Sequence, residues 1–126
     1  MSQDIVADAL NTMRNAKKAG KETIEIKKIS NLLIEILKIM KQKEAIKKYK
    51  INSKEKSVEI TLGDISDCKA IKPRFTVQKG DLEKYERRYL PARGLGELIV
   101  STNKGLMTHE EAAQEGIGGS LIAYFY

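Results

Sequence analysis

The sequence predicts an α+β fold of two small domains packed against each other. Apolar residues recur at helical spacing over residues 4–19 and 31–43, and short β-branched or alternating runs follow both segments. A polar stretch from Gly63 to Lys69 then precedes a change of pattern. We therefore divide the chain into residues 1–64, an α-β-α-β-β unit, and residues 65–126, a mainly β unit with a short helix between strands. A length of 126 residues suits one ordinary domain or two very small ones.

Composition narrows the class of protein. With 41% apolar residues and two prolines, the chain is globular. No apolar run reaches the roughly 18 residues that span a bilayer, and the first twenty residues lack a signal-like stretch, so we expect a cytoplasmic protein. The single cysteine, Cys68, agrees with a reducing compartment. A net charge of +6 favours a polyanionic partner, although many Lys, Ile and Glu residues are also typical of adaptation to heat.

The first helix is predicted from about Asp4 to Ala19, closed by Gly20. Its polar side carries amides and cations at i, i+3, i+4 and i+7, the spacing of neighbouring helical turns. These residues are Asn11, Arg14, Asn15 and Lys18. From the residues alone this is either a solvated face or a contact surface for a nucleic acid.

Four further elements complete the first domain. A half-exposed strand is predicted over 23–28, and Ser30 caps a second helix that runs to about Lys43. That helix is apolar on most sides, so we expect it in the core. Residues 46–52 and 58–62 then form a hairpin. The lysines of Lys47–Lys50 either touch phosphate or protect the edge of the sheet from aggregation.

The second domain begins with its least regular segment. Residues 70–78 read as a broken or edge strand because Pro73 cannot donate to a ladder, and Lys72, Arg74 and Lys79 make this segment basic. A short helix is predicted over 81–89, stopped by Pro91.

A short polar motif, Ser101-Thr102-Asn103-Lys104-Gly105, follows a buried strand at 97–100. We expect it to form the turn into a helix that Thr108 caps, with Glu111 reaching back to the Thr108 backbone, and that ends before Gly116. Two hydroxyls, an amide, an ammonium group and a glycine suit phosphate and sugar oxygens. The alternative is an ordinary connection without a ligand.

The chain ends in a predicted strand over 120–126. Gly118 and Gly119 before it provide either loop flexibility or room for a nucleotide to lie against the backbone. Tyr124 would stack on a base, contact a phosphate, or belong to the core.

Enzymatic and metal-binding motifs are missing from the sequence. A nucleophilic Ser101 or Thr102 would need His109 as its base, with Glu110 or Glu111 to orient that base. Helix capping and the preference of acids for a helix N-terminus already explain the polar neighbours of His109. There is no Gly-x-Ser-x-Gly elbow, Walker sequence or His-Glu-x-x-His site, and one His with one Cys cannot close a zinc site. We therefore expect neither catalysis nor a cofactor nor a metal.

Three blocks in the C-terminal half carry a resemblance to a known family: Ser-Thr-Asn-Lys-Gly, then Met-Thr-His-Glu-Glu-Ala, then Gly-Gly-Ser-Leu-Ile-Ala-Tyr. With Asp-Ala-Leu-Asn-Thr-Met-Arg-Asn-Ala over 8–16, they resemble the eighth family of small-subunit ribosomal proteins, in its archaeal and eukaryotic branch. One departure is Asn103, where many relatives carry serine.

The resemblance implies a structural constituent of the small ribosomal subunit. It implies binding to a helical element in the central domain of the ribosomal RNA, which helps to assemble and stabilise the platform and body. The implied partners are that RNA, neighbouring proteins including the fifth of the small subunit, and, as a hypothesis, the chain's own messenger RNA.

The predicted RNA-binding residues lie in two sets. They are Ser101, Thr102, Asn103, Lys104, Gly105, Gly118, Gly119 and Tyr124 in the second domain, and Asn11, Arg14, Asn15 and Lys18 in the first. A rival hypothesis is a protein–protein adaptor that uses the same surface.

Overall fold

The computed structural model describes residues 5–71, 76–91 and 95–126. The chain separates into two compact units, Met1–Lys69 and Ala70–Tyr126. The domain boundary predicted between residues 64 and 65 stays a prediction. Helices and antiparallel strands make up both units, which confirms the predicted α+β class. No helix in the described part of the chain is long and apolar enough to cross a membrane.

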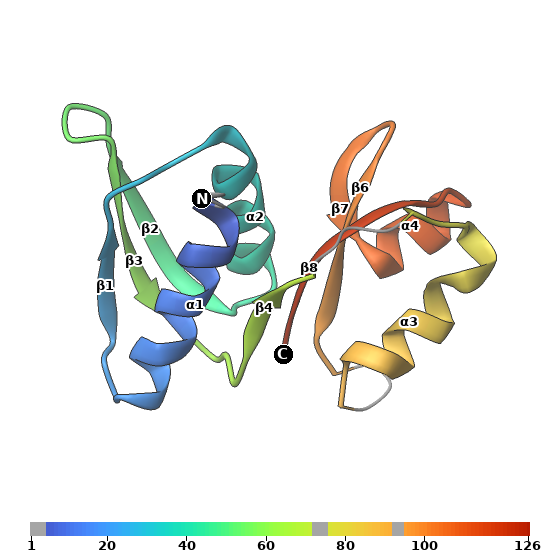
Figure 1. Ribbon diagram of the computed structural model, residues 1–126, viewed down its shortest axis with the longest axis horizontal. Coiled ribbons are helices and arrows are strands. Elements are labelled where there is room, and N and C mark those ends of the chain that lie inside the picture. The colour runs from blue at the N-terminus through green and yellow to red at the C-terminus, as the bar shows by residue number, and fades with distance from the viewer. Residues whose placement is uncertain (1–4, 72–75, 92–94) are drawn as a thin grey trace. The chain divides into compact units, whose positions relative to one another are not determined.

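The first unit has the predicted α-β-α-β-β order. Its elements are α1 (Ile5–Lys18), β1 (Thr23–Ile26), α2 (Asn31–Gln42), β2 (Ile46–Asn52) and β3 (Ser57–Leu62). The strands form an antiparallel sheet in the order β1-β3-β2, and the two helices cover one of its faces (Figure 1). β2 is therefore an edge strand, as its lysine run predicts.

Caps predicted from the sequence fix the ends of both helices. Gly20 takes a φ of 79°, and the N–H of Lys21 donates to the Ala16 carbonyl, which closes α1. The Ser30 hydroxyl accepts from the N–H of Leu33 at 3.2 Å and starts α2. Leu33 and Met40 are fully buried, which confirms that α2 is a core helix.

The second unit is built on a larger antiparallel sheet. Its elements are β5 (Thr76–Val77), a 3₁₀ turn (Lys79–Asp81), α3 (Leu82–Tyr89), β6 (Glu97–Thr102), β7 (Gly105–Thr108), α4 (His109–Glu115) and β8 (Gly119–Phe125). A further strand, β4 (Cys68–Ala70), spans the boundary between the two units. The strand order is β4-β8-β6-β7, and β5 also pairs with β8. Helices α3 and α4 lie beside this sheet (Figure 1). A core that includes Leu82, Leu98, Val100, Ala112 and Leu121 joins them to it.

One local prediction was wrong. The polar motif was expected to lead directly into a helix, but β6 continues through Thr102 and a turn at Asn103 and Lys104 returns the chain as β7. The motif is therefore the tip of a β-hairpin. Gly105 permits this return because its φ of 109° suits glycine alone, and the short apolar pair after it extends the sheet.

The helix after the hairpin begins and ends where the sequence predicts. The Thr108 hydroxyl accepts from the N–H of Glu111 at 3.3 Å, and Gly116 closes α4 with a φ of 69°. The Glu111 side chain differs in detail from the prediction, because its carboxylate accepts from the Thr108 hydroxyl.

The predicted broken strand is described only at its two ends. β4 and β5 flank the interruption. Residues 72–75, which include Lys72, Pro73 and Arg74, lie outside the described residues.

Candidate nucleic-acid interface

The hairpin tip is held by one of its own predicted contact residues. The Thr102 hydroxyl donates to the Gly105 carbonyl at 2.8 Å and accepts from the N–H of Lys104 at 3.1 Å. These two bonds close the turn. The Thr102 side chain thus shapes the tip, and it offers an outside ligand only its remaining acceptor capacity.

Ser101 and Asn103 are the polar side chains of the tip that remain available. Ser101 is half-buried and Asn103 is exposed, and neither side chain makes a hydrogen bond within the part of the chain that the structure describes. Because the strand and the turn fix their backbones, a ligand that binds them orders little additional chain.

The ammonium group of the tip is paired within the protein. Lys104 Nζ donates to Glu115 Oε2 at 2.8 Å, and both side chains are about half exposed. The hydrogen bond and the positive charge of Lys104 lower the pKa of Glu115 below its usual value. The charge of the predicted phosphate contact is therefore partly neutralised in the free protein.

The glycines of the site have intramolecular reasons to be glycine. A Cβ at Gly118 would collide with the Val77 carbonyl oxygen, and a Cβ at Gly119 would collide with that of Ser101. Both residues let strands approach closely within the sheet. A Cβ at Gly105 would meet only open space, so its requirement is the positive φ. That these glycines also admit RNA stays a prediction.

A row of hydroxyl groups lies across the sheet next to the tip. Ser120 on β8 pairs with Ser101 on β6 on one side and with Thr76 on β5 on the other. Directly opposed residues of antiparallel strands point to the same face, so the three hydroxyls lie in line. Sequence reasoning missed Ser120 and Thr76, since only the strand register reveals that they flank Ser101. The one sequence signal for Ser120 was its hydroxyl directly after Gly118-Gly119.

Tyr124 lies in an aromatic cluster. Its ring stacks on Tyr89 with centroids 5.5 Å apart, and on Tyr126 with centroids 6.2 Å apart. Both neighbours pack against the core of the second unit. This geometry supports the core alternative for Tyr124 better than base stacking, although the RNA contact itself stays a prediction.

The four predicted residues of α1 divide into two groups. Asn11, Asn15 and Lys18 are exposed. Arg14 is half-buried, and its Nε lies 2.8 Å from Asp67 Oδ1 in an ion pair that lacks the alignment of a hydrogen bond. Asp67 also accepts the N–H of Cys68, so Arg14 stabilises the loop before β4.

Cys68 is a buried structural thiol. Its Sγ donates to the Leu10 carbonyl at 3.3 Å. Burial, with a smaller contribution from Asp67, raises the thiol pKa to about 12, so the reactive thiolate is scarce at neutral pH.

His109, the histidine considered as a base, is 4% exposed and holds elements together. Its Nδ1 accepts the N–H of Leu98 at 3.1 Å, and its Nε2 lies 2.8 Å from Glu86 Oε2. Glu97, His109 and Glu110 place potential ligand atoms within 4.8 Å of one another. A cation at His109 would have to displace the Leu98 N–H from Nδ1 or the Glu86 carboxylate from Nε2.

Comparison with known proteins identifies the family. A family model described as ribosomal protein S8 matches residues 4–126. The small ribosomal subunit protein uS8 of Nanoarchaeum equitans is 46% identical over 129 residues, and the match covers all of both chains. The predicted resemblance is thereby confirmed, together with the role of a structural constituent of the small ribosomal subunit that binds its RNA and contacts neighbouring ribosomal proteins in the cytoplasmic ribosome. The chain belongs to the ribosomal protein S8 family.

Proposed function

We propose that the β6–β7 hairpin tip and the start of β8 bind a helical element in the central domain of the small-subunit ribosomal RNA. The observation that carries this proposal is the hydroxyl row of Thr76, Ser120 and Ser101, which ends two residues before the exposed Asn103. These short groups donate and accept hydrogen bonds.

The chemistry of the row matches one side of an RNA helix. A-form RNA presents 2′-hydroxyls and base edges in a wide, shallow minor groove, while its deep groove is too narrow for side chains. Hydroxyls at the spacing of neighbouring strands, roughly 5 Å, can follow a ribose backbone without insertion of an aromatic ring. The site therefore recognises mainly shape and backbone.

Lys104 supplies the charge to this contact by exchange of partners. In the free protein its ammonium group is paired with Glu115. An RNA phosphate that approaches the tip competes with this carboxylate for the same donor. Because the pair is exposed, breaking it costs little.

The exposed side of α1 is proposed as a second contact. Asn11, Asn15 and Lys18 lie on one helical face at the spacing of neighbouring turns. Arg14 would support this face through its ion pair with Asp67 and contact RNA with what remains exposed.

Binding of a central-domain ribosomal RNA fragment tests the site. Ser101→Ala and Asn103→Ala should each weaken binding by about 1–3 kcal/mol, because each removes a hydrogen-bonding group from a desolvated contact. The matched control is Ser66→Ala, which removes an exposed hydroxyl outside the proposed surface. Full affinity in both site variants, with folding intact, would refute the proposal.

The finer partners of the chain are also proposals. Gradient sedimentation of a cell extract separates a ribosomal constituent, which migrates with the small subunit, from a free adaptor protein. Cross-linking within the subunit would test the fifth small-subunit protein as a neighbour. Competition by the chain's own messenger RNA for the ribosomal RNA fragment would test autoregulation, and lack of competition would end that hypothesis.

We also propose that the chain has no catalytic role. The buried, doubly bonded ring of His109 supports this, because neither nitrogen is poised to take a proton from a nucleophile.

A further inference from the structure

We propose that the lysine-rich edge of the first unit is a separate contact for the phosphate backbone of RNA. This lysine edge comprises the end of α2, strand β2 and the β2–β3 turn. Its members are Lys38, Lys41, Lys43, Lys47, Lys48, Lys50, Lys54 and Lys56. That the RNA is ribosomal rests on the proposed function, whereas backbone binding by the edge does not.

The lysine edge carries as much net positive charge as the whole protein. Residues 38–56 contain eight lysines and two glutamates, a formal charge of +6, and the complete chain also carries +6. The remaining residues therefore balance to zero. The hairpin tip contributes only Lys104, which is already paired with Glu115. This concentration of lysines can attract a polyanion at long range.

The fold brings these lysines together in space. β2 is the last strand of its sheet, and the end of α2 lies beside it, since Lys41 Nζ lies 5.8 Å from the centre of the Tyr49 ring. A register shift between Ile46 and Lys48 marks a bulge at Lys47. All eight lysines are exposed, and within the described residues the side chains other than Lys43 make no ion pair.

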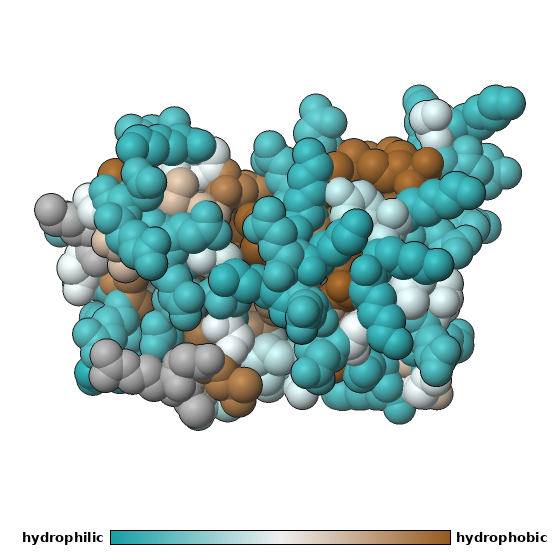
Figure 2. All heavy atoms as spheres, turned by 180° about the vertical axis from the view of Figure 1, so that it is seen from behind, coloured by the Kyte–Doolittle hydropathy of each residue, from teal (hydrophilic) through white to brown (hydrophobic). Residues whose placement is uncertain are grey.

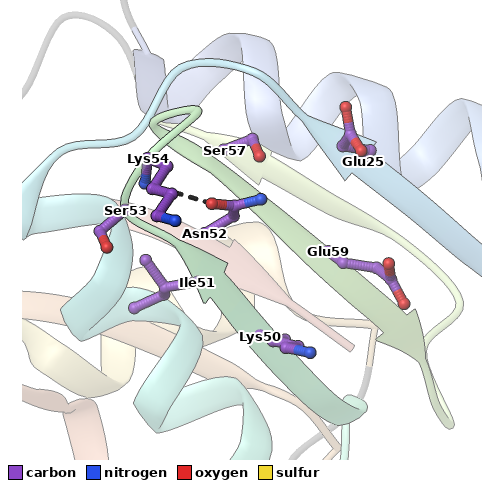
Figure 3. Close-up of a pocket in the computed structure, with 8 residues that line it drawn as sticks. All are labelled: Glu25, Lys50, Ile51, Asn52, Ser53, Lys54, Ser57 and Glu59. Atoms are coloured by element: carbon purple, nitrogen blue, oxygen red, sulfur yellow. Dashed lines mark hydrogen bonds between the residues drawn. The ribbon is translucent and has the colours of Figure 1, made fainter.

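The sheet itself sets a boundary to the basic surface. On the outer face Lys50 is paired in register with Glu59, and Glu59 with Glu25 on β1. These residues line a shallow hollow of about 410 Å³ (Figure 3). Figure 2 shows the face seen from behind covered largely by hydrophilic side chains. Two carboxylates in the hollow would repel a phosphate, so RNA should lie along the β2 edge and the β2–β3 turn.

Protection of the sheet edge against aggregation explains lysines on β2 itself. It does not explain Lys54 and Lys56 in the turn, or Lys38 and Lys41 on a helix. The concentration of charge across three elements fits an extended anion better. Lysine, as a mobile point charge, suits phosphates without base specificity.

The test compares two variants of equal net charge. Lys48, Lys54 and Lys56 are changed to Gln in one, and the exposed Lys21, Lys27 and Lys69 outside the edge in the other. Binding to the central-domain ribosomal RNA fragment and to a duplex RNA of unrelated sequence is measured from 50 to 200 mM salt. The edge variant should lower the salt slope by roughly two to three for both RNAs, and the control should change it little.

Equal effects of the two variants would show that bulk charge alone acts, and an unchanged slope in both would show no contact; either result overturns the proposal. Failure of the proposed function looks different. Ser101→Ala would then leave ribosomal RNA binding intact while the edge variant still weakened binding to both RNAs.

Acetylation of lysines in intact small subunits distinguishes RNA from an acidic protein as the occupant. The proposal expects the lysine edge to be protected in the subunit and to become reactive after ribonuclease treatment. Protection that survives ribonuclease would assign the edge to a neighbouring protein, and full reactivity before treatment would leave it without an occupant. Both results contradict the proposal.

Discussion

Removal of the His109 side chain should destabilise the second unit more than removal of any exposed polar side chain of α4. The imidazole is 4% exposed, accepts the Leu98 N–H at 3.1 Å and pairs with Glu86 at 2.8 Å. In His109→Ala, the buried Leu98 N–H loses its partner, which costs about 1–3 kcal/mol. The cavity and the weakened Glu86 contact add about 1–2 kcal/mol. We expect a total loss of about 2–5 kcal/mol.

Urea unfolding followed by tyrosine fluorescence measures this loss. The chain has no Trp, and four of its five tyrosines, Tyr85, Tyr89, Tyr124 and Tyr126, belong to the second unit. His109→Asn keeps an acceptor near the Leu98 N–H, so it should lose clearly less than the alanine variant. The control Gln114→Ala, exposed on the same helix, should stay within about 0.5 kcal/mol of the parent. A loss below about 1 kcal/mol in His109→Ala would show that these bonds are not structural.

Three further predictions concern Gly119, Cys68 and Glu115. Gly119→Ala should lower the melting temperature more than Gly105→Ala. The added Cβ at residue 119 would meet the Ser101 carbonyl, whereas a Cβ at residue 105 would meet open space and would add only backbone strain. The reverse order of melting temperatures would contradict the close approach of β6 and β8. Cys68 should resist iodoacetamide at pH 8 until the protein is unfolded, and rapid alkylation of the native protein would be inconsistent with its burial. Because the thiol pKa is raised in the folded state, the contribution of Cys68 to stability is present below about pH 9 and is lost as the pH rises toward 12. Glu115→Gln should raise affinity for the ribosomal RNA fragment by releasing Lys104, and lower affinity would argue against exchange of partners. Because the Glu115 pKa is lowered in the folded protein, the pair contributes to stability above the unfolded pKa, and this contribution is lost as the pH falls through the folded pKa.

Local signals in the sequence were sufficient for most elements. Ser30, Thr108 and Gly116 mark helix ends through bonds to neighbours three or four residues away, so periodicity and capping placed those ends closely. β7 was missed because its four residues, Gly105–Thr108, are too few to show alternation. Their strand character comes from pairing with β6, which is tertiary information.

The candidate site was predictable in its composition and not in its geometry. The motif residues stand together in the sequence, whereas the alignment of Ser101 with Ser120 and Thr76 depends on strand register. The internal partners of Thr102 and Lys104 were equally invisible, because a side chain that suits phosphate also suits a carbonyl or a carboxylate. Arg14 shows the same ambiguity through Asp67.

The affinity of Ser120→Ala for the central-domain ribosomal RNA fragment tests the central claim most directly, because the structure alone singles out this hydroxyl. The hydroxyl row predicts a loss comparable to that of Ser101→Ala, about 1–3 kcal/mol, with the melting temperature unchanged. Wild-type affinity in Ser120→Ala, alongside a clear loss in Ser101→Ala, would show that the row is not the contact and that the hairpin tip acts alone.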